Sequence, residues 1–179
     1  MKRNAIVYLL LIFFITASFN VSTPKSIYQF KVPSIEGDVI DFSTFKGKKI
    51  MVVNTASKCE YTYQFTNLQN LYNLYKNKLV IVAFPSDQFN EESESGDDIN
   101  MFCKVRYGVT FPVAEKTPIL GDSASPVYKW LCSKKENGVM DVNIKWSFNK
   151  FLLDEKGKII AHFASNVKPD SDEVLKYLK

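Results

Sequence analysis

Three cysteines and one histidine are the residues of this 179-residue chain whose types suit nucleophilic, redox or metal chemistry. They are Cys59, Cys103, Cys132 and His162, and no two of them form a short C-x-x-C or C-x-x-H pair. Structural zinc sites draw ligands from such pairs, so the spacing argues against a metal site. The histidine lies in the strand-like run Ile159–Phe163, far along the chain from Cys59. We interpret it as a sheet residue and not as the base of a Cys–His protease.

Cys59 has the position best suited to reactivity. It lies in the loop Ala56–Thr62, between an apolar strand predicted at Lys49–Thr55 and a helix predicted from about Thr62. A thiol near a helix N-terminus and beside Lys58 sees positive potential, which is expected to lower its pKa and enlarge the thiolate fraction. A free cysteine is more commonly a small buried hydrophobic residue. The position of Cys59 alone leaves both interpretations open.

The elements on either side of Cys59 predict an α/β arrangement. Apolar and polar residues alternate with period two over Ile27–Val32. A second strand-like segment, Val39–Phe42, follows after a Glu-Gly-Asp turn, which predicts an N-terminal β-hairpin. The strand before Cys59, an amphipathic helix with apolar residues at Phe65, Leu68, Leu71, Leu74 and Tyr75, and the apolar run Leu79–Phe84 make a βαβ unit. Such a continuous apolar run is typical of a parallel strand buried on both faces.

The second half of the chain predicts further helices and one hairpin. Asp97 or Asp98 can cap a helix that ends near Gly108, and Ser125 and Pro126 open another, with Trp130 in the core. The last elements are a hairpin of Phe151–Leu153 with Lys158–Phe163 and a helix over Ser171–Leu178. Strand, helix, strand, hairpin and helix in this order are the thioredoxin-like plan: a central mixed sheet flanked by helices, with the N-terminal β-hairpin in front.

Composition and charge limit the function classes. With 46% apolar residues the chain can bury one sizeable core, and we assign residues 23–179 to a single domain. The net charge of +4 is modest and its basic residues form no stripe, so a nucleic-acid-binding role is not expected. The acidic stretch Asn90–Asp98 is interpreted as a solvated connection.

Residues 1–22 have the pattern of an N-terminal export signal. Met1–Asn4 is basic and Ala5–Phe19 is an apolar run. A signal-peptide apolar region has ~7–15 residues whereas a membrane-spanning helix needs ~20, so cleavage and export to the periplasm or the extracellular space are expected. The small residues that a cleavage site needs are poorly placed. A membrane anchor formed by residues 5–19 therefore stays open as the alternative.

Four segments in register resemble signatures of the glutathione peroxidase family, and they occur in the family's order. The segments are Val53–Cys59, Ala83–Phe89, Tyr107–Pro112 and Lys145–Phe151. The resemblance covers about residues 26–178, nearly the whole chain after the N-terminal segment. Four motifs in order are far more specific than any one of them.

The resemblance implies a thioredoxin-like fold and a thiol peroxidase that reduces hydrogen peroxide and organic hydroperoxides without a metal or organic cofactor. Cys59 stands at the position of the family's peroxidatic cysteine, which attacks the peroxide O–O bond and becomes a sulfenic acid. A free thiol is only a few per cent thiolate at neutral pH, so the site must stabilise the sulfur anion. By resemblance, the side-chain amide of Gln88 and the indole N–H of Trp146 donate toward the sulfur.

The chain departs from the family pattern at several positions. Ser147 stands where the family has an Asn that completes the catalytic set, and its shorter hydroxyl arm puts that hydrogen bond in doubt. Glu60 replaces a Gly, and a carboxylate beside the sulfur opposes thiolate formation. Other departures are Ser86 and Asp87 for Cys-Asn, and Tyr63 for Pro.

Cys103 matches the resolving cysteine of the thioredoxin-dependent branch of the family, which attacks the sulfenic acid and gives an intramolecular disulfide. The alternative is that Cys103 is a buried helix residue. Cys132 is interpreted as an incidental thiol. The chain also lacks the long insertion before the Trp146 motif that tetrameric relatives carry, which implies a monomer.

Two alternatives to a peroxidase recycled by a thioredoxin-like protein stay open. One is a peroxidase that uses glutathione as its reductant. The other is a redox-sensing or binding module that kept the fold and lost turnover, which is motivated by Ser147 and Glu60. A general disulfide oxidoreductase is not expected, because the chain has no C-x-x-C motif.

Overall fold

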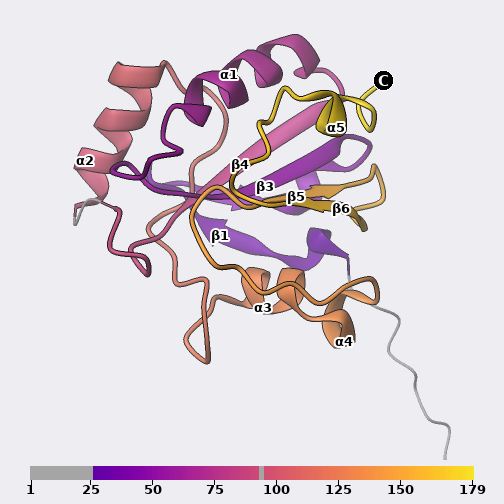
Figure 1. Ribbon diagram of the computed structural model, residues 1–179. Helices are drawn as coiled ribbons and strands as arrows, with labels where there is room; N and C mark the ends of the chain where they lie inside the picture. Colours follow the sequence, from indigo (N-terminus) through magenta and orange to yellow (C-terminus); the bar gives the residue numbers. More distant parts are fainter. Residues whose placement is uncertain (1–25, 93–94) are drawn as a thin grey trace, which may run out of the picture.

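A four-stranded mixed sheet in the order β4, β3, β5, β6 forms the centre of the structure (Figure 1). β3 (Lys49–Thr55) pairs in parallel with β4 (Leu79–Pro85), as predicted for a βαβ unit. β5 (Lys150–Leu153) and β6 (Ile159–Phe163) are added in antiparallel orientation. This arrangement confirms the predicted thioredoxin-like fold.

The computed structural model describes residues 26–92 and 95–179. The predicted export signal at residues 1–22 lies outside the described residues. Within the described part of the chain, no helix combines the length and the apolarity needed to cross a membrane.

The two faces of the sheet carry two separate apolar clusters, because successive side chains of a strand point to opposite faces. On β3, Met51 and Val53 enter one cluster while Ile50 and Val52 enter the other. The first cluster is covered by α1 (Gln64–Tyr75), α2 (Gly96–Met101) and α5 (Asp172–Leu175), and the second by α3 (Pro126–Cys132), α4 (Lys134–Asn137) and the N-terminal hairpin (Figure 1).

The N-terminal hairpin is shorter than predicted. β1 (Lys31–Pro33) pairs with β2 (Val39–Asp41), followed by the 3₁₀ helix η2 (Phe42–Phe45). The extension of the first strand back to Ile27 was wrong, because Ile27–Gln29 forms the 3₁₀ helix η1. The Ile27 N–H donates to the carbonyl of Gly157 at 3.2 Å, so this segment docks on the β5–β6 turn instead of lengthening the hairpin.

Helix α1 buries Phe65, Leu68 and Leu71 against the sheet as predicted. Leu74 was wrongly assigned to the same stripe and is 75% exposed. It lies nine residues after Phe65, which is two and a half helical turns, so it points to the opposite side of the helix.

The helix that carries Cys103 has two parts. α2 begins after Ser95, whose hydroxyl accepts from the Asp98 N–H at 3.0 Å; the N-cap is therefore Ser95 and not Asp97 or Asp98 as predicted. α2 continues into the π-helical segment η3 (Phe102–Arg106), which ends before Gly108 as expected. Two apolar side chains on its outer side are exposed, Met101 by 62% and Val105 by 80%.

The remaining predictions hold with small changes. α3 starts at Pro126 after the N-cap Ser125, and Trp130 is buried in the second cluster. The β5–β6 hairpin is confirmed. α5 is shorter than the predicted Ser171–Leu178, since residues after Leu175 bond as tight turns.

Candidate active site

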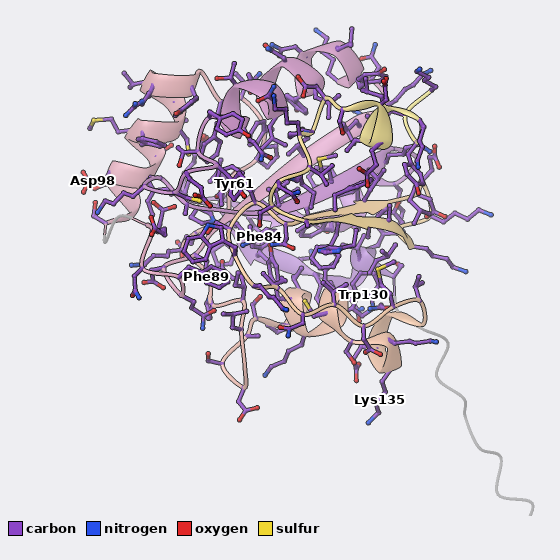
Figure 2. All side chains as sticks on the ribbon, in the orientation of Figure 1. Tyr61, Phe84, Phe89, Asp98, Trp130 and Lys135 are labelled. Carbon is purple, nitrogen blue, oxygen red and sulfur yellow. The ribbon has the colours of Figure 1, made fainter. Side chains whose placement is uncertain are left out.

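Cys59, Gln88 and Trp146 converge at one edge of the sheet. Cys59 and Gln88 follow β3 and β4, whose carboxyl ends lie together because Thr55 pairs with Pro85. Trp146 precedes β5, which runs antiparallel to β3, so the start of β5 meets the end of β3. The loops after β3 and β4 lie on one side of the molecule, where Tyr61 and Phe89 are labelled in Figure 2.

Cys59 is a free thiol with 6% exposure. The backbone N–H of Tyr61 donates to its sulfur at 3.4 Å. The loop around the sulfur is shaped by the Thr62 hydroxyl, which donates to the carbonyls of Ala56 and Cys59. The sulfur thus has a donor from its own loop, which stabilises negative charge on it.

The pKa of the Cys59 thiol is raised above its ordinary value of 9.0. Burial is the largest cause; the Tyr61 N–H and the Trp146 side chain act in the opposite direction, and the carboxylates of Glu91 and Glu60 raise the pKa further. The predicted lowering by a helix N-terminus was wrong. α1 begins only at Gln64, beyond the loop, and desolvation of the charged form outweighs the nearby donors.

Trp146 lies beside Cys59, and its indole N–H lowers the pKa of the thiol. Within the described residues this buried N–H makes no full hydrogen bond, so its effect on the sulfur is weaker than that of a bonded donor. The indole packs against Phe89 with ring centroids 5.5 Å apart. The ring is therefore held between the Cys59 loop and the loop after β4.

Gln88 has its amide turned to another loop. Its Oε1 accepts from the N–H groups of Ile119 and Leu120 at 2.5 and 2.7 Å, and its Nε2 donates to the Leu120 carbonyl at 3.4 Å. Among the residues that the structure describes, these are the hydrogen bonds of the amide. The structure does not bring the expected Gln88 donor onto the Cys59 sulfur.

Ser147 is fully buried, and its hydroxyl has no hydrogen-bond partner in the described part of the chain. The hydrogen bond that the family's Asn would give to the sulfur is thus not supplied by the Ser147 hydroxyl. A buried hydroxyl without a partner costs about 1–3 kcal/mol of stability. Asn149, two residues on, uses its amide for the Trp146 carbonyl and Ser165, so it does not take over this role.

Cys103 lies on the same side of the sheet as Cys59, and both belong to the first apolar cluster. It is 1% exposed, and its pKa is raised to about 12, mainly by burial and then by the carboxylate of Glu92. Cys132 packs against the second cluster, on the other face of the sheet. The sheet therefore separates Cys132 from Cys59, and Cys103 is the thiol that shares its layer.

Glu92 corrects the interpretation of the acidic stretch as wholly solvated. Its side chain is only 7% exposed, and its carboxylate accepts from the Ser57 N–H in the Cys59 loop at 3.1 Å. In a run of acidic residues, the sequence alone does not show which carboxylate is buried and which are solvated.

A buried polar network behind the site was not predicted. Lys150 is fully buried, and its ammonium donates to the Gln64 Oε1 at 2.8 Å and to the carbonyls of Ser165 and Val167. Burial lowers the pKa of Lys150 to about 7. Asn54 joins this network through Asn149 and Ser165, and the one signal for it in the sequence is that it is the single amide in the apolar strand β3.

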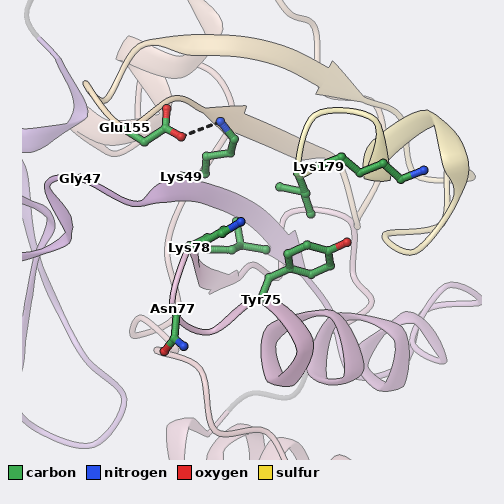
Figure 3. Close-up of a pocket in the computed structure, with 9 residues that line it drawn as sticks. Gly47, Lys49, Tyr75, Asn77, Lys78, Glu155 and Lys179 are labelled. Atoms are coloured by element: carbon green, nitrogen blue, oxygen red, sulfur yellow. Dashed lines mark hydrogen bonds and ion pairs between the residues drawn. The ribbon is translucent and has the colours of Figure 1, made fainter.

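The cavity shown in Figure 3, about 310 Å³ in volume, is remote from this chemistry. It is lined by Lys49, at the first residue of β3, and by its ion-pair partner Glu155 at 2.8 Å. Cys59 follows the opposite end of β3, so this cavity is not the peroxide site. Across residues 26–92 and 95–179, no group of three His, Cys, Asp or Glu side chains is arranged to hold a metal ion.

Solved structures with a similar fold support this geometry. The structure described as Trgpx in its apo form has a TM-score of 0.67 and 36% identity, covering 87% of this chain and 97% of the other. A thioredoxin-family thiol:disulfide interchange protein from Chlorobium tepidum has a TM-score of 0.59 over 88% of this chain and 97% of the other, at 17% identity. At that identity it shows the fold alone.

Sequence comparisons identify the family. The chain is 41% identical to a glutathione peroxidase of Lactococcus lactis subsp. cremoris, over 82% of this chain and 94% of the relative. It is 40% identical to the glutathione peroxidase-like peroxiredoxin 2 of Saccharomyces cerevisiae, over 82% of this chain and 91% of the relative. The family model described as glutathione peroxidase matches residues 27–132. With Cys59, Gln88 and Trp146 brought to one sheet edge in the order of that family's motifs, the chain belongs to the glutathione peroxidase family.

Proposed function

We propose that this chain is a thiol peroxidase in which Cys59 reduces hydrogen peroxide and organic hydroperoxides, and that a thioredoxin-like protein recycles it. The observation that carries the proposal is the buried Cys59 sulfur, with the Tyr61 N–H donating to it and the Trp146 indole beside it. Peroxidase activity is what the names of the relatives state, and the name of the yeast relative, a peroxiredoxin, supports recycling through thiols.

In the first step the sulfur of Cys59 attacks one peroxide oxygen. The S–O bond forms, the O–O bond breaks, and the products are Cys59 sulfenic acid and water or an alcohol. The sulfur loses two electrons and the peroxide gains them. The proton of the Cys59 thiol is the one that the leaving oxygen takes up, so the step needs no other proton source. The Tyr61 N–H and the Trp146 indole stabilise the sulfur as that proton departs.

Gln88 contributes to this step after a change of partner. Its amide must leave Ile119 and Leu120 before Nε2 can reach the sulfur or the bound peroxide. The three hydrogen bonds that it gives up are neutral bonds to backbone groups, each contributing about 0.5–1.5 kcal/mol, so together they match or exceed one bond to an anionic sulfur at about 1.5–3 kcal/mol. The amide is therefore drawn inward only when it bonds to the bound peroxide as well as to the sulfur.

In the second step Cys103 attacks the sulfur of the sulfenic acid, giving a Cys59–Cys103 disulfide and one water. The proton of Cys103 leaves with the hydroxide as that water. A thiol with a pKa of about 12 is a poor nucleophile while it stays buried, and a disulfide forms only with the two Cα atoms within ~7 Å. We therefore expect the segment that carries Cys103 to unwind during this step. A dithiol reductant then restores both thiols by exchange.

The proposal is tested by steady-state reduction of hydrogen peroxide with thioredoxin and its reductase, in parallel with glutathione and glutathione reductase. Turnover is expected with thioredoxin. Cys59→Ser should abolish consumption of peroxide, while Cys103→Ser should keep one turnover of sulfenic acid formation and lose recycling. Cys132→Ser is the matched control and should retain activity. Full activity of Cys59→Ser would refute the role of Cys59, and faster turnover with glutathione would assign the other reductant.

The proposal also includes export of a monomer after removal of residues 1–22. The apolar N-terminal run supports export, and the missing insertion before the Trp146 motif supports a monomer. Sequencing the N-terminus of the protein from cells tests the first point, because retention of residues 5–19 would indicate an anchor. Light scattering of the mature protein tests the second.

A further inference from the structure

Asn54 is the penultimate residue of β3, five residues before Cys59, and its side chain and backbone both reach the Trp146 segment. Its Nδ2 donates to the Trp146 carbonyl at 3.1 Å, and its Oδ1 accepts from the Asn149 N–H at 2.9 Å. Its own carbonyl accepts from the Phe148 N–H at 2.6 Å. One residue of the central strand thus bonds to Trp146, Phe148 and Asn149.

Asn149 also donates to the Trp146 carbonyl. Its Nδ2 donates to the Trp146 carbonyl at 2.7 Å and to the Ser165 hydroxyl at 3.2 Å, and its Oδ1 lies 3.0 Å from Nε2 of His162. The Trp146 carbonyl therefore accepts from two side-chain amides. Both amides are buried, which makes these hydrogen bonds directional constraints and not exchangeable surface contacts.

The backbone between the two amides is in an unfavourable conformation. Phe148 has φ of +63° and is fully buried. A bulky residue in the left-handed region persists only where its surroundings impose it, and such positions cluster at functional sites. The bend at Phe148 is what lets the chain leave Trp146 facing the Cys59 loop and enter β5 directly afterwards.

We propose that Asn54 and Asn149 are positioning residues that hold the Trp146 backbone so that the indole N–H is aimed at the Cys59 sulfur; this inference rests on the proposed peroxidase function. The indole has no hydrogen-bond partner of its own among the described residues, so nothing on the ring fixes its direction by a full bond. Its direction is set by the held carbonyl on one side and by the ring of Phe89 on the other.

The experiment measures two rates in Asn54→Ala and Asn149→Ala. One is the second-order rate of Cys59 oxidation by hydrogen peroxide, and the other is the pH profile of Cys59 alkylation by iodoacetamide in a Cys103→Ser, Cys132→Ser background. Misplacement of a reacting partner by about 1 Å can cost ~100-fold, so we expect oxidation to slow at least tenfold. The alkylation profile should shift to higher pH.

A matched control separates positioning from general stabilisation. Asn137 is a buried amide on the other side of the sheet, and its Nδ2 donates to the carbonyls of Trp130, Leu131 and Met140. Asn137→Ala removes a similar set of bonds, so it should lower the melting temperature while both Cys59 rates stay unchanged.

A double-mutant cycle makes the inference falsifiable even if one variant folds poorly. In a Trp146→Phe background, Asn54→Ala or Asn149→Ala should have no further effect on either rate, because the N–H that they position is gone. An equal loss in both backgrounds, or wild-type rates in the folded single variants, would overturn the proposal. Alkylation needs no peroxide, so failure of the positioning role is distinguishable from failure of Cys59 as the peroxidatic residue.

Discussion

The two side chains expected to assist Cys59 are in different states. On one side, Trp146 is held by two buried amides on its carbonyl and by the Phe89 ring, and its indole already acts on the sulfur. On the other side, Gln88 has its amide bonded to the Ile119–Leu120 backbone. The comparison indicates that the Trp146 side of the site is assembled before peroxide arrives. The Gln88 side must change partner.

The largest effect is expected for Trp146→Phe, which removes a placed donor. Loss of one such preorganised donor typically costs about 10²–10³ in rate, and we expect about 100-fold slower oxidation of Cys59. The rate is measured by quenching with an alkylating reagent and mass spectrometry. Trp130→Phe, in the other layer, is the control and should retain the rate. Equal effects of the two substitutions would show that Trp146 has no special relation to the sulfur.

A smaller effect is expected for Gln88→Ala, about a tenfold loss of the oxidation rate, since this donor joins only during the reaction. The control is Gln69→Ala, another buried amide that bonds a distant loop through Thr110. Gln69→Ala should change stability and not the rate. If Gln88→Ala oxidises as fast as the wild type, the amide stays on Ile119 and Leu120 throughout, and Trp146 alone assists Cys59.

Ser147→Asn changes the Trp146 side of the site and should raise the rate of Cys59 oxidation by up to about tenfold, which corresponds to ~1.4 kcal/mol. The reason is that Asn restores a donor where the Ser147 hydroxyl has no described partner. Stopped-flow oxidation and the alkylation pH profile measure the gain. A slower rate in a well-folded variant would show that the space beside Cys59 does not admit the longer side chain.

The smallest effect is expected on the stability of the fold and concerns Lys150. Its ammonium links Gln64 of α1 to the carbonyls of Ser165 and Val167. Because its folded pKa is about 7 and its unfolded value about 10.5, the unfolded state binds the extra proton between these values, and stability rises with pH there. From pH 7 to 8 this contributes about 1 kcal/mol to the free energy of unfolding. Urea denaturation should show the rise in the wild type and its absence in Lys150→Met. A parallel rise in both proteins would assign it to other groups.

The fold was predictable where the pattern is local. β3 and β4 are uninterrupted apolar runs, and Pro126 after Ser125 marks the start of α3. Even the error at Leu74 was avoidable, because its phase on α1 follows from the residue count. The order of the motifs likewise placed Cys59, Gln88 and Trp146 in one site.

The state of each site residue was not predictable, because it depends on partners far along the chain. The amide of Gln88 is bonded by a loop 31 and 32 residues away. The pKa of Cys59 is raised because burial outweighs the donors, and burial is set by the whole cluster around it. In the sequence, Lys150 looks like an ordinary lysine at the start of a strand. Only the structure shows that Gln64, Ser165 and Val167 surround its ammonium.

The outer side of the Cys103 helix has a thermodynamic consequence. Met101 and Val105 are already in solvent, so lifting this segment newly exposes mainly Ile99, Cys103 and the Phe102 ring that packs on Phe65. Exposing each apolar side chain costs about 1.5–3 kcal/mol, which leaves an open form at well below about one per cent of the reduced protein. Attack of Cys103 on the Cys59 sulfenic acid would trap that minor form as the disulfide. The rate of disulfide formation would then depend on how often the Cys103 segment opens in the reduced protein, before any peroxide is present.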